Sequence, residues 1–191
     1  MDKDSCYGYA DKNWGKDFTS PWLWLTSSHL KSKISGEWLK NSAFDIGGGR
    51  PKILTGQAVD DIIRGAFWYE GQPYEFNFSR FWTLTKTKFY CHEGDEEITW
   101  QVEQETPLAK MIAEISCQKK DMLLINYEAP NGKKLHNRLW NGGNGKGEIK
   151  LYKKILKTKY TDSDKKAEFK WELVDDMEAY NIGCEFGEYD K

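Results

Sequence analysis

Two carboxylates of this sequence lie where a buried acid could act on a substrate. Asp45 precedes three glycines, and Glu75 lies within the aromatic run "AFWYEGQPYEFNF" (residues 66–78). A carboxyl group stays protonated near neutral pH only where burial raises its pKa. Asp45 and Glu75 are therefore candidate catalytic acids, and the alternative for each is a solvent-facing carboxylate. The sequence does not assign the role to either of them.

Aromatic side chains are the second feature that could take part in binding or catalysis. The chain has nine tryptophans in 191 residues, and three of them fall in "YADKNWGKDFTSPWLWL" (residues 9–25). Ring faces attract a developing cation by roughly 0.5–2 kcal/mol. Core packing and an interface to a partner are the alternatives to a ligand pocket. The candidate ligand-binding residues are Trp22, Trp24, Trp68, Tyr74, Trp82 and Trp100.

The strand expected around Trp22 is apolar on both faces. In a β-strand Trp22 and Trp24 point to one side and Leu23 and Leu25 to the other. A closed barrel in water normally covers only its inner face. We therefore expect a second element to cover the outer face, and Trp24 is the residue expected at an apolar cavity or a domain interface.

Other reactive residue types form no recognisable site. The histidines His29, His92 and His136 lack metal-binding spacing, and the sequence "DIGGGRP" (residues 45–51) lacks the Lys-Ser/Thr of a phosphate loop. The four cysteines are widely spaced, which favours free thiols. We expect no metal, no nucleotide and no other cofactor.

Composition limits the functional classes further. Lys and Arg number 28 and Asp and Glu number 30, so the net charge is −2, which gives no electrostatic signature of nucleic-acid binding. The polar start carries no secretory signal, and no apolar run reaches the ~20 residues of a membrane helix. A cytoplasmic protein, with peripheral membrane contact as a further expectation, fits these observations.

Alternation of apolar and polar residues predicts many strands. It occurs in a hairpin at 66–78, in "ITWQVEQE" (98–105), in "EIKLYKKI" (148–155) and in "AEFKWELV" (167–174). The segment "PLAKMIAEISC" (107–117) fits a helix as well, but its neighbours favour a strand. Three glycines at 47–49 predict a tight corner or a close backbone approach, "NGGNGKGE" (141–148) predicts a loop, and the charged residues 152–166 predict an exposed hairpin tip. The fold expected is an all-β antiparallel barrel with at most a little helix.

The order of several motifs resembles the second half of the tocopherol cyclase family. Tyr9, Lys12, Asn13, Trp14, Gly15, Phe18, Trp22 and Trp24 match the family's entry element. The similarity continues through "GGG" (47–49), "YEGQPYEF" (69–76), "NGKKL" (131–135) and "GEIKL" (147–151), and it ends near "MEAYNIGCEFG" (177–187). The chain departs from the family at "TSP" (19–21), where the family places proline directly after the phenylalanine.

The resemblance implies a lipocalin-like barrel and a substrate class. Residues 1–191 would form a single domain, equivalent to the C-terminal barrel of a protein whose first barrel is not in this chain. The family's plant members close a prenylated quinol into a chromanol ring by protonating an alkene, and the isolated half is expected to be inactive. The implied partners are an apolar, prenylated or lipidic small molecule and an N-terminal barrel. The alternatives are a lipid-binding module without turnover and a structural half that docks on that first barrel.

Overall fold

The structure is a computed structural model that describes residues 21–49, 62–77, 84–128, 134–160 and 165–188. These residues form one antiparallel sheet, and the only helix in these ranges is the short 3-10 turn η2 (Lys119–Asp121). The expected all-β fold is therefore confirmed. The strands are β1 (Trp22–Ser27), β2 (His29–Ser32), β3 (Trp38–Leu39), β4 (Ala43–Gly49), β5 (Ile62–Tyr69), β6 (Gln72–Phe76), β7 (Lys86–Glu93), β8 (Glu97–Glu105), β9 (Ala109–Gln118), β10 (Met122–Glu128), β11 (Lys134–Tyr160) and β12 (Lys165–Glu188).

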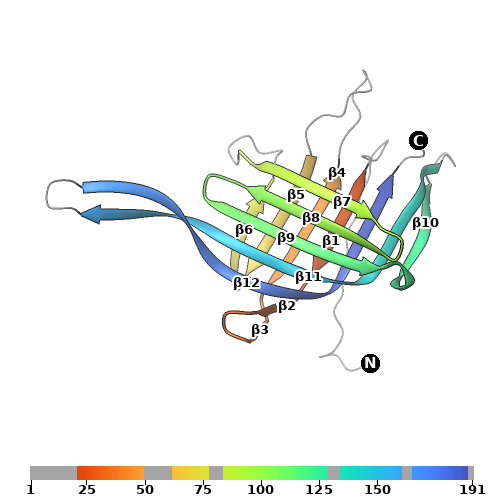
Figure 1. The fold of residues 1–191 in the computed structure, drawn as a ribbon, viewed down its shortest axis with the longest axis horizontal. Helices are drawn as coiled ribbons and strands as arrows, with labels where there is room; N and C mark the ends of the chain where they lie inside the picture. Colours follow the sequence, from red (N-terminus) through yellow and green to blue (C-terminus); the bar gives the residue numbers. More distant parts are fainter. Residues whose placement is uncertain (1–20, 50–61, 78–83, 129–133, 161–164, 189–191) are drawn as a thin grey trace, which may run out of the picture.

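The sheet curls into a lipocalin-like half-barrel (Figure 1). Its hydrogen-bonded strand order is β6-β5-β4-β1-β12-β11-β9-β8-β7, and β10 and the short β2 and β3 pair beside this path. The curl brings the two halves of the sheet face to face, so that each strand has an inward and an outward side.

Apolar residues point into the space between the two halves. Ile98, Trp100 and Val102 of β8 are buried, as the alternating pattern predicts. In β9, Met111 and Ile115 are buried on the same face of a continuous strand, so the strand interpretation of residues 107–117 is confirmed over Ala109–Gln118. Leu23 and Leu25 of β1 are fully buried in the same core.

Two glycine-rich segments that we expected to be a corner and a loop are strands. Residues 45–49 lie inside β4, and residues 141–148 lie inside β11, so the corner and the loop are wrong. The close backbone approach is correct, because a Cβ on Gly47 would lie 3.4 Å from the Trp24 ring. A Cβ on Gly147 would lie 2.8 Å from Ile115 Cα and would collide with the Glu114 carbonyl. Here glycine allows close strand packing rather than a turn.

The last part of β11 (residues 152–160) and the first part of β12 (residues 165–173) extend past the barrel as a two-stranded arm (Figure 1). The charged residues expected at an exposed hairpin tip lie on this arm. At its base, Leu151 pairs with Asp175 but Tyr152 pairs with Leu173, so Val174 is an extra residue in β12. Such a bulge reverses which alternate residues face inward.

Because of the bulge, the expectation of a half-buried strand at 167–174 is wrong. On the C-terminal side of the bulge, the odd-numbered Met177 and Ala179 are buried and face the core. On the arm the odd-numbered Phe169 is 69% exposed and Leu173 is 41% exposed. The strand alternates as expected, but no described residue covers the apolar face that the alternation predicts to be buried.

Glycine at position 147 should be required by the fold. We expect Gly147→Ala to lower the free energy of unfolding by roughly 2–4 kcal/mol, because the added methyl group meets backbone atoms that cannot move independently. Gly143→Ala is the matched control in the same strand, since a Cβ there has nothing within 4 Å. Urea unfolding followed by fluorescence would measure both changes, and equal stabilities of the two variants would contradict the packing argument.

Candidate functional site

The barrel interior contains one fully buried amide, that of Gln104 on β8. Its Nε2 donates to the Ile63 carbonyl oxygen at 3.1 Å and to Thr87 Oγ1 at 3.4 Å. Space for this amide depends on Gly65, where a Cβ would overlap the Gln104 side chain. Gln104 Oε1 has no hydrogen-bond partner. The amide thus joins β8 to β5 across the interior and keeps one acceptor unused.

Trp100 presents an unused donor on the same inward face of β8. The side chain is fully buried, and its Nε1 has no hydrogen-bond partner. An unpaired buried polar group costs about 1–3 kcal/mol. The interior therefore combines an apolar lining with one unused donor and one unused acceptor, a combination that suits an apolar ligand with a small polar group.

A second polar contact spans the interior at the other end of β5. Tyr69 OH donates to Asp175 Oδ2 at 3.0 Å, and Ser32 Oγ donates to Asp175 Oδ1 at 2.7 Å. The backbone N–H of Asp176 also donates to Asp175 Oδ1, at 2.8 Å. Asp175 is buried, and these three donors match a carboxylate that only accepts hydrogen bonds.

The environment of Tyr69 keeps its hydroxyl protonated. Burial, together with the hydrogen bond to the Asp175 carboxylate, raises the pKa of Tyr69 to about 12. A phenol with so high a pKa is a stable hydrogen-bond donor and a poor acid. Tyr69 and Asp175 therefore hold β5 against β12, and the Tyr69 hydroxyl does not act as an acid at neutral pH.

The candidate ligand-binding aromatics do not converge on one pocket. Trp100 and Tyr74 pack in the interior. Trp22, Trp24 and Trp68 lie on the outer face, and Trp68 is 49% exposed. Trp82 lies outside the described residues.

The outer face of β1 explains the close spacing of Trp22 and Trp24. Trp22 Nε1 donates to Glu185 Oε2 at 2.8 Å, and Asn141 Nδ2 donates to Glu185 Oε1 at 2.6 Å. The Trp24 ring extends over Gly183, where a Cβ would lie 3.1 Å from Cζ3. Glycines on the neighbouring strands thus make room for flat indoles, whose N–H groups bind carboxylates. The predicted division of the two faces of this strand is correct.

The two candidate acids lie together on the outer face. Asp45 pairs with Ala66, and Ala66 pairs with Glu75, so the three residues form one row across β4, β5 and β6. Asp45 Oδ1 accepts a hydrogen bond of 3.0 Å from Trp24 Nε1. Within the described residues neither Asp45 nor Glu75 faces the apolar interior.

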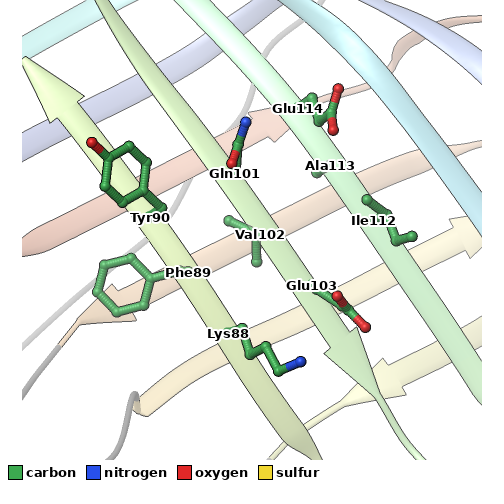
Figure 2. A pocket seen from close by; sticks show the side chains of 9 residues that line it. All are labelled: Lys88, Phe89, Tyr90, Gln101, Val102, Glu103, Ile112, Ala113 and Glu114. Carbon is green, nitrogen blue, oxygen red and sulfur yellow. The ribbon is translucent and has the colours of Figure 1, made fainter.

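A shallow hollow of about 260 Å³ lies on the outer side of β7, β8 and β9 (Figure 2). Its walls are mixed in character, with Tyr90 and Ile112 beside Glu103 and Glu114. Lys110 forms a 2.7 Å ion pair with Glu103, and this contact lowers the pKa of Glu103. The hollow holds ionised groups and offers no enclosed apolar volume.

The parts of the chain that the structure describes contain neither a metal-binding cluster nor a membrane-spanning helix. No group of three or more His, Cys, Asp or Glu side chains there is placed to hold a metal ion. No helix among those residues is long and apolar enough to cross a membrane. Cys117 and Cys184 are free thiols, and Cys6 lies outside the described residues.

The interior polar residues Gln104, Tyr69 and Asp175 were not among the predicted site residues. Gln104 continues the alternation of Ile98, Trp100 and Val102, so a polar residue at an inward position was visible in the sequence. Asp175 continues the alternation of the buried Met177 and Ala179, so its inward position was visible in the sequence as well.

No protein family, curated protein or solved structure matches this chain. The function is therefore argued from the residues themselves.

The contact between Tyr69 and Asp175 should make stability depend on pH in the alkaline range. The folded state holds the Tyr69 proton more tightly than the unfolded chain, whose tyrosine pKa is near 10. The stabilisation is therefore complete below pH 10 and is lost as pH rises from 10 towards 12.

Tyr69→Phe measures that contribution directly. We expect the variant to be about 2 kcal/mol less stable at pH 7, the order of a hydrogen bond to a charged group. The difference from the unmodified protein should shrink between pH 10 and 12 in urea unfolding. Tyr90→Phe, at an exposed tyrosine of β7, is the control. A stability difference that stays constant across this range would contradict the assignment.

Proposed function

We propose that this protein binds an apolar small molecule, of the prenylated or lipidic class, inside its barrel. The ligand would carry a hydroxyl or carbonyl group that uses the free hydrogen-bonding atoms of the interior. The observation that carries the proposal is Gln104, a fully buried amide with an unpaired Oε1 in an apolar surrounding. A hydroxyl group of the ligand can donate to this oxygen.

The interior supports binding better than turnover. Ring closure through alkene protonation requires an acid that is protonated at neutral pH and directed at the ligand. Asp175 accepts three hydrogen bonds, and Tyr69 has a pKa of about 12. Asp45 and Glu75 belong to the outer face. A cyclase activity of the kind implied by the tocopherol cyclase-like resemblance would thus need an acid from elsewhere.

A docking role for the outer face is the second candidate function. Trp22 and Trp24 lie there, and both side chains are partly exposed. Tryptophans with bonded N–H groups are typical of packed interfaces. This face is the part of the fold where an N-terminal barrel would be accommodated.

Binding can be tested with the intact protein and a prenylated hydroquinone. Native mass spectrometry after mild extraction should show a retained lipid or quinol, and titration should give saturable quenching of tryptophan fluorescence. Gln104→Leu should weaken quinol binding about tenfold, the value of one neutral hydrogen bond. It should leave the binding of a prenyl hydrocarbon without a hydroxyl group unchanged.

Gln101→Leu is the matched control, because Gln101 lies on the same strand and is exposed on the outer face. Absence of saturable binding, or an equal effect of the two leucine variants, would contradict the proposal. Chromatography of the incubated quinol adds a second measurement. A chromanol product would show turnover and would exclude a purely binding role.

A further inference from the structure

The arm has one apolar face and one charged face. Register places Leu156 opposite Phe169, and Tyr152 opposite Leu173. Trp171 lies between Phe169 and Leu173 on the same side of the ribbon. The opposite side holds two ion pairs, Lys153–Glu172 at 3.2 Å and Lys170–Glu168 at 3.3 Å. We call the side with Tyr152, Leu156, Phe169, Trp171 and Leu173 the apolar arm face.

This face is open to solvent. Leu156 is 56% exposed and Phe169 is 69% exposed, and both lie past the bulge, where the barrel no longer covers the strand. Figure 1 shows this part of β11 and β12 extending well away from the rest of the sheet. A group of exposed large apolar residues on a projecting element marks an interaction surface.

The arm is basic, whereas the chain as a whole is slightly acidic. Residues 152–173 contain seven lysines and four acidic residues, a net charge of +3 in a chain of net charge −2. Lys154 lies on the apolar arm face itself, with its Nζ 4.5 Å from the centre of the Trp171 ring. A lysine against an indole can bury its aliphatic stem and keep its charge at the level of lipid headgroups.

We propose that the arm binds the surface of an anionic phospholipid bilayer. The apolar arm face would enter the region between headgroups and acyl chains, and Lys154 on that face would contact the anionic headgroups. The opposite, ion-paired face remains in water. A bilayer accepts a narrow ribbon without shape complementarity, whereas two such arms from neighbouring copies would bring like charges together. Leucines at two of the five apolar positions offer nothing to stack on nucleic-acid bases.

Sedimentation with vesicles tests the proposal on the full chain. Binding should be strong to vesicles of phosphatidylcholine with about one third phosphatidylserine, weak to phosphatidylcholine alone, and reduced by 0.5 M salt. Leu156→Ser with Phe169→Ser should weaken binding at least tenfold, because the inserted apolar area is lost. Lys154→Gln should weaken it about fivefold, since one lysine near such a surface contributes a factor of about five.

Leu123→Ser is the control, because Leu123 of β10 is equally exposed but lies away from the arm. Circular dichroism should be unchanged in every variant, as all the substituted side chains are on the surface. Absence of vesicle binding, equal binding to both vesicle types, or an equal effect of Leu123→Ser would overturn the proposal. A dimer in light scattering, or binding to single-stranded RNA, that the double serine variant abolishes would also overturn it, in favour of that partner.

Discussion

One extra residue in β12 determines which side chains next to it face the core and which face solvent. Val174 has no partner in β11, and the pairing shifts there from Leu151–Asp175 to Tyr152–Leu173. On one side of this bulge Asp175, Met177 and Ala179 are buried, and on the other side Phe169 and Leu173 are exposed. Without the bulge, Asp175 and Phe169 would share a face, because side chains alternate with a period of two. The inward carboxylate and the exposed apolar arm face are thus two results of the same irregularity.

The interior depends on polar contacts at both ends of β5. Gln104 holds the start of this strand through the Ile63 carbonyl, and Asp175 holds its end through the Tyr69 hydroxyl. Between these two contacts the interior is apolar. A buried polar group costs free energy unless its hydrogen bonds are made, so the hydrogen-bonded atoms of Gln104 and Asp175 favour one separation of the two walls. The unsatisfied Gln104 Oε1 lies at a position that the fold itself holds in place.

Alternation was sufficient to predict the strands and the faces of β1, β6 and β8, because each is regular and half-buried. It failed where glycines allow close packing, since "NGGNGKGE" has the composition of a loop but lies in a strand against Ile115. It also wrongly predicted that Phe169 and Leu173 are covered, because a one-residue bulge has no compositional signal. The candidate site was predicted least well. Residue type pointed to tryptophans and acids, whereas the interior contact is made by a glutamine whose importance comes from burial.

The two proposals concern opposite sides of the bulge, and they fit a single physical task. A molecule with a long prenyl or acyl chain has negligible solubility in water and resides in a bilayer, because every buried methylene contributes about 0.8 kcal/mol. A protein that binds such a molecule meets it at the membrane surface. An arm that holds the barrel at that surface would shorten the path of the ligand through water. The arm and the interior would then be separable by mutation, because no residue of the apolar arm face belongs to the polar contacts inside the barrel.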